Sequence, residues 1–507
     1  MLQEGQVVLF LIERGIAVVN LLAFLSFFTQ WRGLISSHGL SPLKQFQKKV
    51  LKACWGEAKD KGSPRTWKEW IAVFCTVPSL TWFCNEDWFL AFLIYAGIGC
   101  SVLAIVNCYA KLSFLVCGVC YLSLKSVAEP FLSLQMDGNL IELDFLFWLG
   151  TLFDSFYPFV QIITLRFHVF RIMLACGLVK IFGSACWRDF TAMCYHYYTQ
   201  PLPNPLSPIF HFLPTWFHKF STIMTFFVEI GVPFLYFGPA WARLLGLLAS
   251  MGLLVMINIS GNYGFLGLMT VCITLSLTND SHWLFFTPAT VPPITVMQHI
   301  IGTLGIAIVL FYNFVCLAPL IQSSKYMDPP FFLNKCHQAL KPFRVTNYYG
   351  KFGSMRTERY ELIILATSDC QNWKEIDFKY KPGRITNQPK WVPFGHLPRL
   401  DWRTWFLPSL AAKNHDPPDW WSNLLQGILS NNKEILSLLD MFKYPFTSEE
   451  RPVKLRTAIF RYNFVPPIKH KEDGKGDDDA KSDAQKVFWK RELIGFFGHE
   501  VTRTEDD

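Results

Sequence analysis

Four ionisable residues lie within long apolar runs of this 507-residue chain, and they are the first candidates for chemistry: Asp154, Arg171, Lys180 and Glu229. A charge at the centre of a membrane helix costs about 2.5–3.5 kcal/mol on insertion scales. Charges kept at that cost either line a polar or proton-linked cavity, or form interhelical ion pairs. Arg171 with Asp154 or with Glu229 is an example of such a pair, and both interpretations stay open here.

The segment 187–216 is the second candidate, because it is rich in aromatic residues, histidine and proline. Five prolines between Pro201 and Pro214 fix φ and remove backbone donors, which excludes a regular helix over that stretch. A rigid, extended loop of this kind suits a docking surface or the lid of a cavity. Three histidines, separated by 15 and 7 residues, match no compact zinc motif, so no metal is predicted for His196, His211 and His218.

The remaining chain offers a turn and no catalytic motif. Asn262 and Tyr263 follow Gly261 between two apolar segments, where Asn and Gly favour a tight turn or, as the alternative, a ligand site. The sequence contains no P-loop, no GxGxxG after a strand, no nucleophile elbow and no HExxH. We therefore predict no catalytic residue and no cofactor.

The composition divides the elements that carry these residues into two parts. Hydrophobic residues make up 51% of the chain and charged residues 17%, and the mean hydropathy is +0.24. Residues 323–507 hold 53 charged residues, whereas residues 1–322 hold only 33. This pattern excludes a disordered chain, a disulfide-stapled miniprotein and a typical cytosolic enzyme. It predicts a membrane part followed by a water-soluble part.

The apolar runs predict a polytopic α-helical membrane protein with about eight to ten membrane-embedded helices, because a spanning helix needs about 20 apolar residues. The first span is too long for a cleavable signal and should remain as an anchor. The predicted spans are Val7–Phe28, Trp70–Trp82, Trp88–Cys108, Leu112–Leu124, Asp144–Leu165, Phe167–Phe182, Phe220–Phe237, Leu244–Ile259, Phe265–Leu277 and Ile300–Ile321.

The soluble part is predicted to be mixed and β-rich. We expect a transmembrane domain over 1–322, a soluble C-terminal domain over 323–467 and a charged, largely disordered tail over 468–507. The predicted strands are Tyr360–Ala366, Ile376–Tyr380 and Thr457–Phe464, and the predicted helices are Trp420–Leu439 and a short amphipathic one over Val487–Val501. A disulfide between Cys336 and Cys370 is left open.

The net charge of +8 does not indicate nucleic-acid binding. Half the basic residues of the apolar part lie in one inter-span loop, between Trp31 and Glu69. Such a loop is typical of a topology determinant that faces the cytoplasm or an anionic lipid surface. The expected partner of this part is the lipid bilayer.

Several motifs in the membrane part resemble the lipase maturation factor family. The segment 195–206 is similar to the family signature YHYETQPLPNPL, with Tyr198 where the family has Glu. The residues that match it include Tyr195, His196, Thr199, Gln200, Pro201, Pro203, Asn204 and Pro205. The helix with Arg171 and Lys180, the Gly261–Tyr263 turn and the segment 132–142 resemble further family motifs.

The resemblance continues into the C-terminal part. Glu358, Arg359 and Glu361 lie in a segment similar to TxERxEvxxxGT, and 399–406 resembles RLDWxxWF, with Arg399, Asp401 and Trp402. The family resemblance implies a non-enzymatic role in folding and assembly of secreted lipases at the endoplasmic-reticulum membrane. It implies that the C-terminal domain faces the lumen and contacts the client. For such a folding factor, we expect the surfaces of Leu362–Ala366 and Arg399–Trp405 to engage the client.

Two other functions remain as alternatives. One alternative is a scaffold or accessory subunit of a larger membrane complex. In that case the abundant Trp and Phe side chains would pack against other subunits. The other is a membrane enzyme, in which Lys180, Arg171 and His196 surround a cavity that holds a lipid-like substrate.

Overall fold

The computed structural model describes residues 5–56, 66–154, 156–283, 295–324, 327–413, 415–447, 450–466 and 487–503. Within them, seven helical segments are long and apolar enough to cross a membrane. The protein is therefore a multi-pass membrane protein. The seven segments are α1 (Gln6–Phe28), α5 (Asp87–Ile105), α6 (Ala110–Val127), α8 (Pro158–Ile181), Thr215–Phe237, α13 (Ala240–Ser260) and Val296–Gln322.

Two of these segments consist of consecutive helices. Thr215–Phe237 comprises α12 (Thr215–Phe226), the π-helical turn η4 (Phe227–Gly231) and the 3-10 helix η5 (Val232–Phe237). Val296–Gln322 comprises α15 (Val296–Val315) and α16 (Leu317–Gln322). The shorter helices of the membrane part are α2 (Trp31–Ile35), α3 (Leu43–Trp55), α4 (Trp67–Thr76), η2 (Leu80–Trp82), α7 (Gln135–Leu149), η3 (Gly150–Leu152), α9 (Ala185–Arg188), α10 (Ala192–Thr199), α11 (Ser207–His211), α14 (Leu266–Thr274), η6 (Leu275–Leu277) and η7 (Asp280–His282).

Fewer helices are long enough to span than the eight to ten embedded helices expected. The predicted span Asp144–Leu165 is wrong, because α7 ends at Leu149 and α8 begins at Pro158. A proline suits the first turn of a helix and disfavours helical backbone in the residue before it. The predicted span Trp70–Trp82 is divided between the ten-residue helix α4 and the turn η2, and Leu266–Leu277 is apolar but short. The prediction of no regular helix between Pro201 and Pro214 is wrong at α11, which accommodates Pro208 in its first turn.

The C-terminal domain is built on an antiparallel sheet with strand order β2-β1-β3-β4. Its strands are β1 (Arg359–Thr367), β2 (Lys374–Ile376), β3 (Lys454–Phe464), β4 (Trp489–Phe496) and β5 (Val501–Thr502), and β5 pairs with β3. Its helices are α17 (Phe331–Leu340), η8 (Lys341–Phe343), α18 (Arg399–Thr404), α19 (Leu407–Ala411), α20 (Asp419–Leu429) and α21 (Lys433–Leu436).

The predicted strands over Tyr360–Ala366 and Thr457–Phe464 are confirmed as β1 and β3. The predicted strand Ile376–Tyr380 shares only Ile376 with β2. The predicted helix Trp420–Leu439 is two helices, because Asn431 at φ +57° ends α20 and Asn432 caps α21. The Cys336 and Cys370 thiols are both free.

The amphipathic helix predicted over Val487–Val501 is wrong. These residues form β4 and β5, and Trp489 of β4 lies opposite Phe464 of β3, with the two rings stacked 4.4 Å apart. β3 offers these residues a strand edge to pair with, and its Phe464 ring covers the buried Trp489. The sheet therefore continues past residue 467, where the charged tail was expected to begin. Of the tail predicted over 468–507, residues 468–486 and 504–507 lie outside the described residues.

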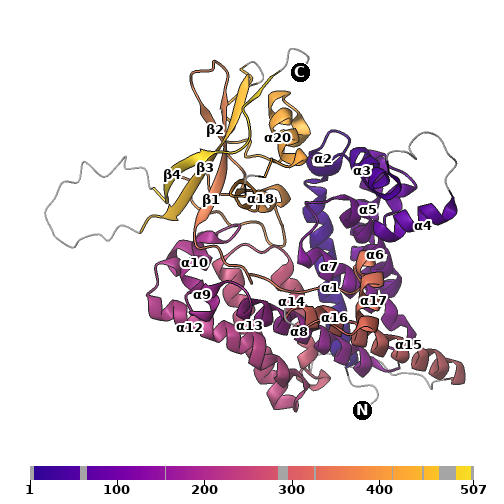
Figure 1. Cartoon of the computed structure of the whole chain (residues 1–507). Coiled ribbons are helices and arrows are strands. Elements are labelled where there is room, and N and C mark those ends of the chain that lie inside the picture. The colour runs from indigo at the N-terminus through magenta and orange to yellow at the C-terminus, as the bar shows by residue number, and fades with distance from the viewer. Residues whose placement is uncertain are drawn as a thin grey trace.

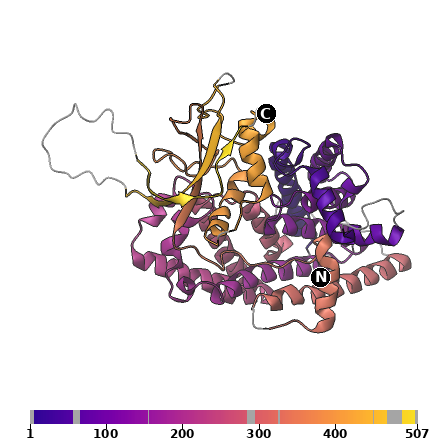
Figure 2. The ribbon, with the colours of Figure 1, turned by 45° about the horizontal axis from the view of Figure 1, so that its top comes forward.

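The two parts share one hydrophobic core. Leu397 and Leu400 of the C-terminal domain are buried in the same cluster as Phe24 and Phe27 of α1. Figure 1 shows the sheet at one end of the helical part, above α10, with α20 beside α2. Figure 2 shows the same arrangement from a turned view.

The segment 36–42, which follows α1 and α2 and belongs to the basic loop, contacts the C-terminal domain. Asn432 donates a hydrogen bond to the His38 carbonyl at 3.0 Å, and Asn423 donates to the Leu40 carbonyl at 2.8 Å. The basic loop and the C-terminal domain therefore lie on the same side of the membrane. The sequence predicted a cytoplasmic basic loop and a lumenal C-terminal domain. These two predictions cannot both be correct.

Candidate functional site

The family-signature residues meet in the junction, which we define as residues 195–206, the turn 261–263, and the parts of the C-terminal domain packed on them. Helix α10 ends at Thr199 because Pro201 follows two residues later and disfavours helical backbone at Gln200. Asn204 then holds the segment in place. It accepts hydrogen bonds from the backbone N–H groups of Leu206 and Ser207, and its amide donates to the Ile259 carbonyl at 2.7 Å.

Gln200 is the centre of a buried network in the junction. Its amide nitrogen donates to the carbonyls of Tyr197 and Ser260, so its oxygen is left to accept the phenol proton of Tyr263 at 2.7 Å. The Tyr263 oxygen lies 3.2 Å from Nε2 of His196. Burial lowers the pKa of His196 to about 4, so the imidazole is neutral.

Arg359 of β1 binds the carbonyl ends of this segment. Its guanidinium donates to the carbonyls of Tyr198 at 2.8 Å, Gln200 at 2.5 Å and Pro201 at 3.1 Å. Its charge is balanced by Glu361, which also pairs with Lys381 at 2.5 Å, and these side chains are fully buried. Arginine presents several donors in a fixed plane, which suits the binding of several carbonyls at once.

Further hydrogen bonds attach the C-terminal domain to the membrane part. The Asn262 side chain donates to the Lys390 carbonyl and accepts from the Val392 N–H. The Trp405 indole donates to the Thr199 carbonyl at 2.8 Å, and the Trp402 ring packs edge-on against Tyr263. The Gly261–Tyr263 turn thus serves interdomain packing.

The Arg399–Asp137 pair is a buried ion pair between the two parts. The guanidinium makes two bonds of 2.8 Å to the carboxylate, and the Tyr121 phenol of α6 donates to the same carboxylate at 2.8 Å. Both charged side chains are fully buried. Breaking such a pair from one side leaves an uncompensated buried charge, which costs about 3–5 kcal/mol.

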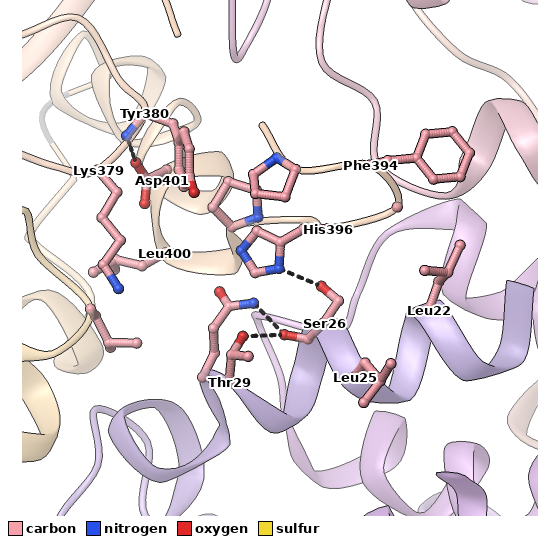
Figure 3. Close-up of a pocket in the computed structure, with 15 residues that line it drawn as sticks. Leu22, Leu25, Ser26, Thr29, Lys379, Tyr380, Phe394, His396, Leu400 and Asp401 are labelled. Carbon is pink, nitrogen blue, oxygen red and sulfur yellow. Dashed lines mark hydrogen bonds between the residues drawn. The ribbon is translucent and has the colours of Figure 1, made fainter. Parts of the chain in front are cut away.

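Asp401 lies two residues farther along and is also buried. It accepts a hydrogen bond from the Tyr380 N–H at 2.7 Å, and burial raises its carboxyl pKa to about 6. It borders a pocket of 440 Å³ between α1 and residues 393–401, where the His396 ring meets the Ser26 hydroxyl at 3.2 Å (Figure 3). This pocket is the gap between the first spanning helix and the domain packed on it.

The intramembrane charges form ion pairs, but not the pairs expected. Arg171 binds Glu142 of α7 at 2.5 Å, rather than Asp154 or Glu229. Lys180 binds both carboxylate oxygens of Glu229, at 2.6 and 2.8 Å. The interhelical ion-pair interpretation therefore describes these charges.

Asp154 takes part in a third pair, with Lys111 at the start of α6. Lys111 also binds Glu13 of α1, so one ammonium group joins α1 and α6 to the turn before α8. A cation between two carboxylates offsets the desolvation of both.

Comparison with known proteins follows the division into two parts. The family model described as the lipase maturation factor transmembrane domain matches residues 8–285, and the model described as the lipase maturation factor C-terminal domain matches residues 345–498. The chain belongs to the lipase maturation factor family.

Relatives in the family match most of the chain. Lipase maturation factor 1 of Mus musculus is 30% identical, over 95% of this chain and 85% of its own. Lipase maturation factor 1 of Homo sapiens is 30% identical, over 96% and 86%. Lipase maturation factor 2 of Xenopus tropicalis is 26% identical, over 95% and 80%. No solved structure matches the chain significantly.

The structure of this lipase maturation factor family member gathers most of the signature residues into the junction, where they are buried. Leu362, Ile364, Arg399 and Trp402 are each less than a tenth exposed. The surfaces Leu362–Ala366 and Arg399–Trp405 are therefore wrong as client-binding surfaces. Glu358 is exposed and lies outside the junction, where it pairs with Arg461 at 3.1 Å.

Sequence reasoning missed two buried partners, Lys381 and Tyr349. Lys381 balances Glu361, and the Tyr349 phenol donates to Glu142 at 2.7 Å. Both lie in irregular segments, so no periodic pattern in the sequence indicates that they are buried. The one available signal is that a buried carboxylate such as Glu361 or Glu142 requires a partner. In the described part of the chain, no three His, Cys, Asp or Glu side chains are grouped to hold a metal ion.

Proposed function

We propose that this chain assists the folding and assembly of secreted lipases at the endoplasmic-reticulum membrane, acting without catalysis. Its membership in the lipase maturation factor family supports this role. The buried signature residues then act as a clamp that holds the C-terminal domain in a defined position on the membrane part. The boundary at residue 322 between the two parts is a proposal of the same kind.

We propose that β4 is the client-binding edge of the C-terminal domain. Strand β4 is the last of the four in the sheet order, and no further strand covers its outer side among the described residues. Leu493, Ile494 and Phe496 are each about half exposed there. An open strand edge with apolar side chains suits an extended segment of an incompletely folded client, which adds backbone hydrogen bonds and buries its own apolar residues.

The test is a pair of lysine substitutions on β4, Leu493→Lys with Ile494→Lys. We expect the activity of a co-expressed lipase secreted by cells lacking their own family member to fall at least fivefold, because two charges oppose the apolar contact. Met441→Lys is the matched control, since Met441 is half exposed in the same domain but outside the sheet. It should leave secretion unchanged.

The scaffold-subunit alternative predicts a different result. Full lipase secretion by the β4 variant, together with a stable co-purifying membrane complex, would favour it. The enzyme alternative required Lys180, Arg171 and His196 to surround one cavity. Arg171 instead pairs with Glu142 and does not line the cavity that Lys180 and His196 border.

A further inference from the structure

The loop 391–396 of the C-terminal domain carries an exposed apolar run. Trp391, Val392, Pro393 and Phe394 follow one another without a polar or charged residue between them. Trp391 is 53% exposed and Phe394 is 77% exposed, and Pro393 is exposed as well. A run of four apolar residues in water is unfavourable unless it serves a function. The run is therefore expected to have an apolar surrounding.

The loop crosses the first spanning helix, α1, at Leu22. Gly395 has φ +74°, and a Cβ built on it would lie 2.7 Å from Cδ1 of Leu22. Glycine is therefore required here both by the backbone conformation and by the close approach to the helix. Phe394, Leu22 and Leu25 border the same pocket, and Figure 3 shows Phe394 on the same side of that pocket as Leu22, opposite to Lys379.

Leu22 belongs to the face of α1 that the other helices leave open. Val18, Leu22 and Leu25 are spaced by four and three residues, so they lie on one side of the helix. Val18 is 36% exposed and Leu25 is 41% exposed, whereas Phe24 and Phe27 on the other side are fully buried. An apolar stripe that protein leaves uncovered on a spanning helix faces lipid. The loop therefore meets α1 on its lipid-facing side.

The contact lies inside the span rather than at its end. Helix α1 has 23 residues, and at 1.5 Å per residue it is about 34 Å long. The hydrocarbon core of a bilayer is about 30 Å thick. Leu22 precedes the last helical residue, Phe28, by six positions, or about 9 Å. A loop that touches Leu22 is therefore level with the hydrocarbon near one surface of the membrane.

The backbone of the run is suited to a surrounding without water. The Val392 N–H donates to Oδ1 of Asn262 at 3.1 Å, and Pro393 has no N–H. The Pro393 carbonyl accepts a hydrogen bond from the His396 N–H at 2.9 Å. Backbone groups without partners are costly in lipid, so these bonds lower the cost of placing the loop there.

We propose that Trp391 and Phe394 insert into the bilayer beside α1 and anchor the C-terminal domain to lipid. Aromatic side chains are enriched at membrane–water interfaces, where the ring contacts hydrocarbon and an indole N–H reaches the headgroups. Lipid then holds the domain on the open side of α1, in addition to the buried contacts of the junction. A second copy of the chain is the competing occupant of this loop.

The test places a genetically encoded fluorescent amino acid at position 394 of the full-length protein in phosphatidylcholine nanodiscs. Bromine atoms on the acyl chains quench a fluorophore that contacts them, whereas iodide quenches one in water. We expect brominated lipid to quench position 394 at least twofold and iodide to have little effect. Position 371 is the control, because Gln371 is exposed in the turn beyond β1, at the end of the strand away from Arg359 and the junction. It should respond to iodide and not to brominated lipid.

Phe394→Asp provides a second measurement, with the fluorophore moved to position 391. Phe394 is exposed, so its replacement removes no side chain from the core. Because a charge opposes insertion, brominated lipid should quench position 391 at least twofold less than in the chain that keeps Phe394. Phe442→Asp is the matched control, since Phe442 is fully exposed in the same domain and does not border the pocket. It should leave the quenching unchanged.

Three outcomes would contradict the proposal. Quenching of position 394 by iodide rather than by brominated lipid would place the loop in water. Protection of position 394 from both quenchers would show that protein, such as a second copy, covers it. Equal quenching of position 391 in Phe394→Asp and Phe442→Asp would remove the anchoring role of Phe394. None of these outcomes depends on lipase secretion, so the proposed function is tested separately.

Discussion

Individual residues of the RLDW segment show how a family motif serves packing. Arg399 reaches across the domain boundary to Asp137, whereas Asp401 turns back to the Tyr380 N–H in its own domain. The Arg399 charge is neutralised by its partner. The Asp401 carboxyl accepts a backbone hydrogen bond but has no direct ion pair among the described residues, so its ionisation is opposed by burial.

Asp401 should make the stability of the protein depend on pH. Its carboxyl pKa rises from 3.8 to about 6 on folding. The folded state therefore binds the proton more tightly, and stability present below about pH 4 is lost as pH rises through 6. The rise in pKa corresponds to about 3 kcal/mol. We expect the melting temperature in detergent to fall from pH 4.5 to 7 more steeply for the unaltered chain than for Asp401→Asn.

The Asp401→Asn variant keeps the acceptor for the Tyr380 N–H, because an amide oxygen replaces the carboxylate oxygen. Parallel pH profiles of the two proteins would show that Asp401 does not control this dependence. Asp189→Asn, a substitution at the end of α9 outside the junction, is the control.

At the scale of elements, the break between α20 and α21 connects the C-terminal domain to the loop after α1. Asn432 accepts hydrogen bonds from the N–H groups of Glu434 and Ile435, and it donates to the carbonyl of His38. A single side chain thus caps a helix and joins two segments that lie far apart in the sequence.

Replacing Asn432 by alanine should cost about 1 kcal/mol for the cap, and it also removes the bond to His38. We expect a lower thermal unfolding midpoint and faster proteolysis at residues 36–42. Asn372→Ala, in an exposed turn of the same domain, is the matched control. An unchanged midpoint in Asn432→Ala would show that α21 is held by Ile435 and Leu436 alone.

At the scale of the whole molecule, the contact between the C-terminal domain and the loop after α1 constrains how the chain is oriented in the membrane. The loop after α1 and the C-terminal domain share one side of the membrane. If the C-terminal domain faces the endoplasmic-reticulum lumen, as the proposed function requires, the basic loop faces it as well. The positive charge of that loop is then an exception to the usual cytoplasmic placement.

Two engineered glycosylation sites test this orientation. Lys52→Asn with Cys54→Thr creates a site on exposed residues of α3, and Lys374→Thr creates one at the exposed Asn372. We expect each variant to gain one endoglycosidase-sensitive glycan relative to the unaltered chain. Modification of only one variant would contradict the shared side, and modification of neither would contradict a lumenal domain.

The sequence by itself determined the membrane class, the mixed C-terminal domain and the family, because these follow from hydropathy, periodicity and motifs along the chain. It predicted α1 and α5 nearly to their ends, since a long apolar run has few alternatives in lipid. It also identified Arg171 and Lys180 as costly charges that require partners.

Only the tertiary structure decided which partners those charges have and which surfaces are exposed. Glu142 and Glu229 reach Arg171 and Lys180 from other helices, and Lys381 reaches Glu361 from a loop, so spacing along the chain carries no trace of the pairing. The same holds for β4, whose sequence WKRELIGF does not alternate regularly and forms a strand because β3 lies beside it. Which side chains pair and which are buried depends on contacts between residues far apart in the sequence, and these contacts form only in the folded chain.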